Sequence, residues 1–193
     1  MLHNRFYTKK PLWTSSEEFD ESWKERISKM AANIDIPGTV VDIGCGMMWL
    51  ESQLNELNGY IPVDFVRRDE RTIVLDLNKD TLPEFNAPIA FLSGILEYVS
   101  DVGQFSQDLT RLGFDKIILS YCTVEKYPNL RWRKKLNWVS HLSIFELIAL
   151  FIANYDVVML DDLNGNTILV LERNVRRPQH VVSRSPARLA SLV

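Results

Sequence analysis

The chain has 193 residues, of which 46% are hydrophobic and 24% are charged, and its formal net charge is −3 at pH 7. This composition is typical of one globular domain and excludes a mainly disordered chain. The most apolar stretch, 142–160, contains Glu146, Asn154 and Asp156, whereas a membrane-spanning helix needs about 20 mostly apolar residues. No apolar run follows the first basic residues, so we expect no secretory signal and a cytoplasmic protein.

The charges are unevenly distributed along the chain. From Arg173 onward there are five arginines and no acid, so the rest carries 17 basic and 25 acidic side chains, a balance of −8. We therefore expect a single domain over 1–172, followed by a basic, flexible tail over 173–193. An acidic body disfavours broad binding of nucleic acid, which depends on many phosphate contacts.

The sequence contains two cysteines, Cys45 and Cys122. Neither has the spacing of a metal ligand relative to the other or to His3, His141 and His180. We expect no metal site, and we interpret both cysteines as buried, reduced thiols.

The first predicted element is a helix over 15–34. Its apolar side chains recur at steps of three and four residues, at Phe19, Trp23, Ile27, Met30 and Ile34. Ser15 and Glu18 have the spacing of a capping box at its start.

The remaining chain alternates between strand and helix patterns. Short β-branched or apolar runs predict strands over 39–43, 60–64, 72–76, 88–93, 115–121, 155–160 and 166–172. Helical spacing predicts helices over 47–57, 101–112 and 144–153, the last with a capping box at Ser143 and Glu146. The turn 161–165 is too short for a parallel crossover, so the last two strands form an antiparallel hairpin. The pattern predicts a three-layer α/β fold with a seven-stranded, mostly parallel sheet.

One connection conflicts with this fold. The link 65–71 has seven residues, whereas a parallel crossover with a full helix needs about ten to twelve. Either its helix is reduced to a single turn, or one of the flanking strands is misassigned.

A glycine turn follows the first strand, in the sequence VVDIGCGMM over 40–48. Gly44 and Gly46 allow a sharp bend and a close approach to a ligand. The helix expected behind them would offer free N–H groups to an anion. The next two strands end at Asp64 and Asp76 on the same edge, where ligands of open α/β sheets bind. Each feature alone could be a turn or a helix cap, but their order predicts a ligand pocket.

A dinucleotide site is the first alternative for this turn. Its motif, G-x-G-x-x-G, requires a third glycine for close contact of helix and strand. Trp49 occupies that position, which disfavours NAD or FAD.

The segment VVDIGCG resembles the first motif of the class I methyltransferases that use S-adenosylmethionine, in which an acid precedes G-x-G. The resemblance implies their Rossmann-like methyltransferase fold, with S-adenosylmethionine as cofactor. It assigns the methionyl part of the cofactor to Asp42, Gly44 and Gly46. The third glycine common in that motif is Met48 here.

The resemblance extends to the ends of the next three strands. It assigns the ribose hydroxyls to Asp64 and the adenine to Asp76 and Leu77. The segment SGILEYV, which begins at Ser93, is similar to the family's strand-4 segment, which borders both cofactor and acceptor.

Methyl transfer requires alignment of cofactor and acceptor, and a general base only where the acceptor loses a proton. The candidate catalytic residues are Glu97 and Tyr98 after the fourth strand, and His141 before Ser143. Each also has a structural interpretation, as a solvated acid, a half-buried ring and a helix-entry histidine respectively.

The insert 122–140 combines basic and aromatic side chains. These are Tyr127, Arg131, Trp132, Arg133, Lys134, Lys135 and Trp138. We expect a lid that faces the acceptor, since rings and cations together bind anionic, stackable molecules. The alternative is a cap helix that packs on the body through Leu130, Leu136 and Trp138.

Three functions remain open at this point. The first is a methyltransferase for small molecules, with a sugar or a polysaccharide precursor as one acceptor class. The second is a nucleic-acid or protein methyltransferase that uses the insert and the tail. The third is a non-catalytic cofactor-binding module that acts through a partner.

Overall fold

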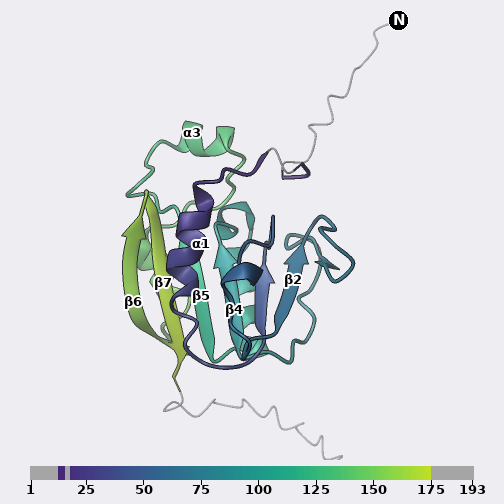
Figure 1. Cartoon of the computed structure of the whole chain (residues 1–193). Coiled ribbons are helices and arrows are strands. Elements are labelled where there is room, and N and C mark those ends of the chain that lie inside the picture. The colour runs from purple at the N-terminus through teal and green to yellow at the C-terminus, as the bar shows by residue number, and fades with distance from the viewer. Residues whose placement is uncertain (1–12, 16–17, 175–193) are drawn as a thin grey trace, which may run out of the picture.

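The computed structural model describes residues 13–15 and 18–174, which form a seven-stranded sheet in the order β3-β2-β1-β4-β5-β7-β6 (Figure 1). The strands are β1 Val40–Ile43, β2 Tyr60–Asp64, β3 Ile73–Val74, β4 Ile89–Ser93, β5 Lys116–Tyr121, β6 Tyr155–Leu163 and β7 Asn166–Arg173. Strands β1 to β5 run parallel, and β7 is antiparallel to both β5 and β6. The predicted fold class, including the closing hairpin, is confirmed. The predicted tail lies outside the described residues from 175 onward.

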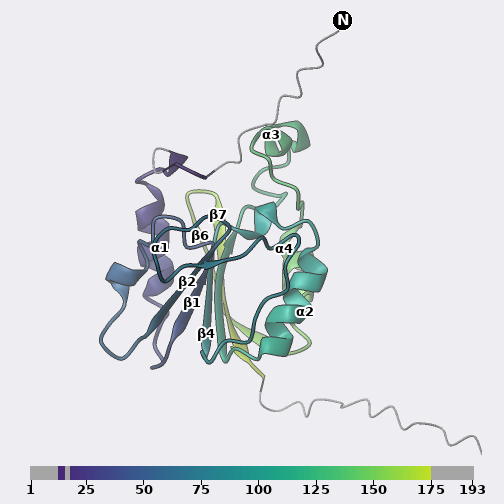
Figure 2. The same cartoon turned by 90° about the vertical axis from the view of Figure 1, so that its right-hand side faces the viewer.

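Helices cover both faces of the sheet (Figure 2). On one face lies α1, Trp23–Ala31; on the other lie α2, Val102–Leu112, and α4, Ile144–Ala149. Successive residues of one strand serve opposite faces, since Val40 packs in the cluster with Met30 of α1 and Val41 in the cluster with Leu109 of α2. Continuous apolar strands therefore build two cores, one on each side.

The N-terminal helix is shorter than the predicted 15–34. The Ser15 amide donates to Glu18 (3.1 Å), as in a capping box, but this turn precedes the helix. Asp20 accepts the Ser22 N–H at 2.9 Å, a local bond that competes with helix formation. The helix consequently begins at Trp23.

The predicted helix over 47–57 is wrong. The segment contains only the 3₁₀ turn η2, Glu51–Gln53. Met48 has a positive φ of 57°, and Leu54 is already extended. Of the apolar residues at helical spacing, Leu50 is 1% exposed whereas Leu57 is 67% exposed, so the spacing did not mark a buried helix face. No helix N-terminus stands behind the glycine turn.

The short link between β2 and β3 has a simple explanation. Strand β3 pairs only with the last two residues of β2, Val63 and Asp64. The start of β3 therefore lies only about one residue back from the end of β2. The link 65–71 covers this short distance without a helix. Both predicted strands are present, and the crossover helix is absent.

The other helices agree better with the sequence. Asp101 caps α2 by accepting the Gln104 N–H (2.9 Å), and the capping box of Ser143 and Glu146 starts α4. No helix in the described part of the chain is long and apolar enough to cross a membrane.

The geometry of the hairpin turn between β6 and β7 can be tested by mutation. Its two residues, Asn164 and Gly165, have φ values of 49° and 80°, which is the geometry of a type I′ turn. A Cβ at Gly165 would collide with the Tyr127 hydroxyl. We expect Gly165→Ala to lower the free energy of unfolding by about 1–2 kcal/mol in denaturant titrations. Asn164→Gly keeps the turn geometry, and a loss of similar size there would contradict this explanation.

Candidate functional site

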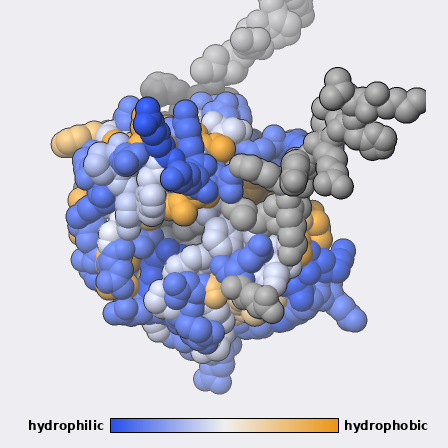
Figure 3. All heavy atoms as spheres, turned by 90° about the horizontal axis from the view of Figure 1, so that it is seen from above, coloured by the Kyte–Doolittle hydropathy of each residue, from blue (hydrophilic) through white to orange (hydrophobic). Residues whose placement is uncertain are grey.

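A cavity of about 610 Å³ lies at the carboxyl edge of the parallel strands. Figure 3 views the molecule from this side and shows hydrophobic side chains among mostly hydrophilic ones. Every predicted site residue except His141 lines the cavity: Asp42, Gly44, Gly46, Asp64, Asp76, Leu77, Ser93, Glu97 and Tyr98. Its volume falls in the range of roughly 300–1,000 Å³ common for small-molecule sites.

The glycine loop is held by β2. The N–H groups of Gly44 and Cys45 donate to the Val63 carbonyl (2.8 and 3.0 Å), and Gly46 donates to Asp64 Oδ2 at 2.8 Å. Gly44 has a φ of 79°, and a Cβ there would lie 2.8 Å from Ile95 Cγ1, so this position requires glycine. These three N–H groups of the loop bond to protein, and the helix whose free N–H groups we had expected to face an anion is absent behind the loop.

Asp42 is a buried acid beneath this loop. Its Oδ2 accepts the Tyr60 hydroxyl at 2.8 Å. Burial raises the pKa of the Asp42 carboxyl to about 7, and the charge of Asp64 adds to this effect. The carboxyl therefore changes protonation state near neutral pH.

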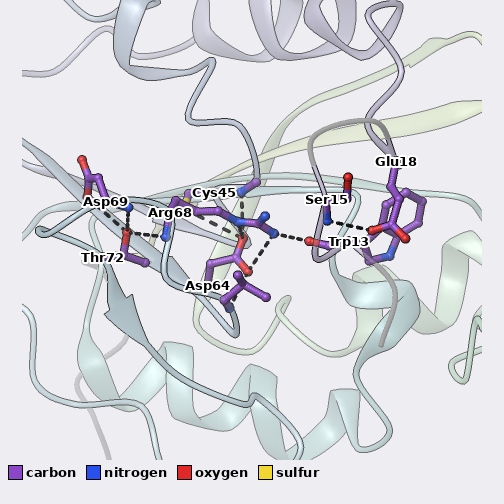
Figure 4. Close-up of polar contacts among 10 residues, drawn as sticks. Trp13, Ser15, Glu18, Cys45, Asp64, Arg68, Asp69 and Thr72 are labelled. Atoms are coloured by element: carbon purple, nitrogen blue, oxygen red, sulfur yellow. Dashed lines mark hydrogen bonds and ion pairs between the residues drawn. The ribbon is translucent and has the colours of Figure 1, made fainter. Parts of the chain in front are cut away.

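The Asp64 carboxylate is already engaged (Figure 4). Besides Gly46, it accepts the Val66 N–H (3.0 Å) and pairs with Arg68 (two contacts of 3.3 Å). Arg68 also donates to the Trp13 carbonyl at 2.6 Å, which ties the N-terminal segment to β2. Ribose hydroxyls at Asp64 would have to displace Arg68.

Asp76 and Leu77 follow β3 at the rim of the cavity. Asp76 accepts the Asn78 N–H at 3.0 Å and forms an ion pair with Lys79. The bond from Lys79 lowers the pKa of Asp76, so this acid is ionised at neutral pH. Leu77 is partly buried against the core.

Arg26 is a cavity residue that the sequence reasoning missed. Its Nε donates to Ser93 Oγ (3.0 Å) and one terminal nitrogen donates to Asn166 Oδ1 (2.9 Å). The guanidinium lies 5.6 Å from the centre of the Trp23 ring. Helical spacing contained the signal, because Arg26 stands three residues after Trp23 and four before Met30, on the buried face of α1.

Glu97 is buried rather than solvated. It lies in η3, Leu96–Tyr98, and is 1% exposed. Its Oε1 accepts the Cys122 N–H at 2.7 Å, whereas Oε2 has no hydrogen-bond partner among the described residues. Burial raises the pKa of the Glu97 carboxyl. The neighbouring Tyr98 accepts a hydrogen bond from the Trp138 indole at 3.2 Å.

We had expected the cations of the basic insert to face a ligand, but Arg133 does not. It is fully buried and donates to the carbonyls of Cys122 (2.7 Å) and Ser140 (3.0 Å), at the two ends of the insert. Its Nε donates to His141 Nδ1 at 3.1 Å. His141 therefore supports Arg133 and does not line the cavity.

The insert 122–140 nevertheless lies over the carboxyl edge, where its helix α3, Leu130–Lys135, is visible (Figure 1). Tyr127 and Trp132 are stacked with ring centres 5.2 Å apart, and Trp138 meets both edge-on. All three rings line the cavity. We call 122–140 the lid segment, and its role as a lid remains a proposal. Among the described residues, no group of His, Cys, Asp or Glu side chains could hold a metal ion.

Several solved structures with a similar fold are methyltransferases or come from complexes with them. A chain from the complex of the Haloferax volcanii Trm112 methyltransferase activator has 13% identity and a TM-score of 0.67, with 82% of this chain and 93% of that chain covered. Burkholderia thailandensis 1,6-didemethyltoxoflavin-N1-methyltransferase has 15% identity and a TM-score of 0.58, covering 80% and 79%. The N-methyltransferase NodS of Bradyrhizobium japonicum has 8% identity and a TM-score of 0.57, covering 79% and 86%.

No protein-family model matches the chain, and no curated protein matches it in sequence. At these identities the solved structures establish the fold. The chain has the class I, Rossmann-like fold of S-adenosylmethionine-dependent methyltransferases, as the segment 40–46 indicated.

The raised pKa of Asp42 predicts a pH dependence of stability. Between its ordinary pKa of 3.8 and about 7, only the folded state keeps the proton, so the free energy of unfolding falls as pH rises through this range. We expect Asp42→Asn to reduce the loss between about pH 5 and pH 8 by on the order of 3 kcal/mol.

The Glu97 carboxyl, whose pKa is also raised, acts with the same sign, so some slope should persist in this variant. Chemical denaturation at several pH values measures the effect, with the exposed Glu56→Gln as control. A slope unchanged by Asp42→Asn would show that this carboxyl is ionised throughout.

Proposed function

We propose that the protein is an S-adenosylmethionine-dependent methyltransferase that acts on a small molecule. The observation that carries this proposal is the single cavity shared by the glycine loop, the strand-end acids Asp42, Asp64 and Asp76, and the acceptor-side residue Glu97. Two neighbours in fold support it, since their structures contain S-adenosylhomocysteine, and one also contains its small-molecule substrate.

The cavity fits the cofactor at most of its expected contacts. Asp42, Gly44 and Gly46 would hold the methionyl part, and Asp76 with Leu77 would frame the adenine. The bound cofactor supplies a methyl group on a positively charged sulfur. Asp64 would hold the ribose hydroxyls only after Arg68 has moved.

The shape of the site favours a small acceptor. Glu97 is fully buried beneath the aromatic side chains of the lid segment, so an acceptor has to enter the cavity to reach it. A sugar or a polysaccharide precursor fits this description as one class, because saccharide rings also pack on aromatic side chains.

The two other functions predict different behaviour. A nucleic-acid or protein methyltransferase would use the exposed cations of α3, which are Arg131, Lys134 and Lys135, and would bind RNA in a salt-sensitive manner. A non-catalytic module would bind cofactor without turnover and act with a partner, and one neighbour in fold occurs in a complex with an activator.

The first test is cofactor binding. Calorimetry should detect S-adenosylmethionine or S-adenosylhomocysteine binding to the folded protein. Gly44→Ala should weaken it at least about tenfold, because the new Cβ would displace the loop from Ile95. Gly103→Ala, in α2 away from the cavity, should bind normally. No heat with either ligand on folded, unmodified protein would contradict the proposed function.

Replacement of Arg68 should change the stability of the protein and its affinity for the cofactor in opposite directions. Arg68→Ala removes an ion pair that is nearly buried, so the melting temperature should fall. The same change frees the Asp64 carboxylate, and affinity for S-adenosylhomocysteine should rise about fivefold, since a hydrogen bond of about 1 kcal/mol no longer has to be exchanged. Asp64→Asn should lower affinity. If Arg68→Ala lowers affinity and Asp64→Asn does not, then Arg68 and not Asp64 contacts the cofactor.

A further inference from the structure

A half-buried arginine, Arg26, and a buried glutamate, Glu97, line the cavity without pairing with each other. Glu97 Oε2 has no hydrogen-bond partner among the described residues, and Arg26 donates to two neutral groups, Ser93 and Asn166. Within the described part of the chain, Arg26 and Glu97 form no ion pair, although each influences the charge of the other. Buried charges are normally paired or fully hydrogen-bonded. This half of the cavity therefore lacks a partner for each group.

The protein itself holds both groups in position. Arg26 donates to Asn166 Oδ1 (2.9 Å), which also accepts from the Cys122 thiol (3.4 Å), and the Cys122 N–H donates to Glu97 Oε1 (2.7 Å). This chain of contacts joins α1, β7, the residue after β5 and η3. Because Oε1 is fixed by this bond, Oε2 is the oxygen left without a hydrogen-bond partner among the described residues. The guanidinium has room because Gly94 lacks a side chain, whose Cβ would lie 3.0 Å from it.

The cavity that contains these two groups is lined by flat aromatic rings. The Trp23 ring lies against the Arg26 guanidinium, and the Trp13 ring is 5.3 Å from Trp23 and 6.0 Å from Tyr98. The aromatic rings of the lid segment line the same cavity. Such walls favour a planar ligand, because rings stack in offset or edge-to-face arrangements.

We propose that this half of the cavity binds hydroxylated aromatic carboxylic acids, with the carboxylate on Arg26 and the hydroxyl donating to Glu97 Oε2. The inference rests on the proposed function, which makes this ligand the methyl acceptor. On transfer the acceptor oxygen bonds to the methyl carbon as the methyl–sulfur bond breaks. The hydroxyl proton passes to the Glu97 carboxylate, and S-adenosylhomocysteine leaves with the electron pair of the broken bond.

A carboxylate at Arg26 could come from the acceptor or from the methionyl part of the cofactor. The sheet order favours the acceptor. Arg26 bonds to Ser93 on β4 and Asn166 on β7, whereas the acids assigned to ribose and adenine follow β2 and β3, on the other side of β1. The experiment has to separate the two sources.

Calorimetric titration of the protein saturated with S-adenosylhomocysteine tests the proposal. The probes are the three hydroxybenzoate isomers, with phenol and benzoate as matched ligands that each lack one group. We expect the best isomer to bind at least about tenfold more tightly than phenol or benzoate, since each lost contact involves a charged group.

Two variants, of which Glu97→Gln is isosteric, assign the contacts. Arg26→Gln should remove most of the preference over phenol, and Glu97→Gln most of the preference over benzoate. Arg131→Gln, on the exposed side of α3, should change neither. Melting curves show whether each variant is folded, and the comparison of ligands on the unmodified protein decides the proposal even where a variant is not.

Several results would overturn the proposal. These are equal affinity for phenol and the best isomer, or no binding of any isomer at millimolar concentration. An Arg26→Gln variant that loses affinity for S-adenosylhomocysteine but keeps the preference over phenol would assign Arg26 to the cofactor. D-glucuronate has a carboxylate and hydroxyls but no flat ring. If it binds more tightly than the best hydroxybenzoate isomer, the site would be assigned to uronic acids.

Failure of the proposed function is seen separately. If S-adenosylhomocysteine does not bind, the methyltransferase assignment fails. The same titrations on the protein alone then decide the carboxylate and hydroxyl contacts, because Arg26 and Glu97 are held by bonds within the protein.

Discussion

The carboxyl edge of the sheet depends on how the loop after β1 is held. In this chain no α-helix follows the loop, and its N–H groups bond instead to the end of β2, at the Val63 carbonyl and the Asp64 carboxylate. One residue therefore has two duties. Asp64 keeps the glycine loop in place and also anchors Arg68, which in turn holds the carbonyl of Trp13. The N-terminal segment, the loop and β2 thus meet at a single carboxylate.

The positive charges of three arginines near this edge are compensated by neighbouring groups to different degrees. Arg133 is surrounded by carbonyl and hydroxyl oxygens and packs 4.9 Å from the Trp138 ring centre, so its charge is satisfied within the lid segment. Arg68 has a carboxylate, Asp64. Arg26 has only neutral acceptors, while Glu97, which lines the same cavity, keeps one oxygen unpaired among the described residues. Desolvated charges are costly without partners. The charges of Arg133 and Arg68 are therefore explained by contacts within the protein, whereas that of Arg26 is not.

The sequence was most informative where local chemistry and burial agree. Continuous apolar runs predicted all seven strands, and Asp101 and Ser143 marked the starts of α2 and α4. The turn 161–165 predicted the hairpin because five residues are too few for a parallel crossover. It failed at 47–57, where helical spacing of apolar residues coexists with a left-handed Met48 and an exposed Leu57. Periodicity does not reveal whether a face finds a partner, so such errors need tertiary information.

The candidate site shows the same limit in another form. Motif order located Asp42, Gly44, Gly46 and Asp76, because strand ends of a parallel sheet meet at one edge. The state of each group could not be predicted, since it depends on contacts far apart in sequence. Glu97 is buried and accepts a bond from Cys122, 25 residues later, and Asp64 is occupied because Arg68, which also bonds to Trp13, pairs with it.

The roof of the cavity comes from two segments that are far apart in the chain, and Tyr98 touches both. Its ring meets Trp13 of the N-terminal segment at 6.0 Å, and its hydroxyl accepts from Trp138 of the lid segment at 3.2 Å. Trp13 is in turn bonded to Arg68 beside Asp64. The contacts that close the β2 side of the cavity are thus continuous with those above Glu97.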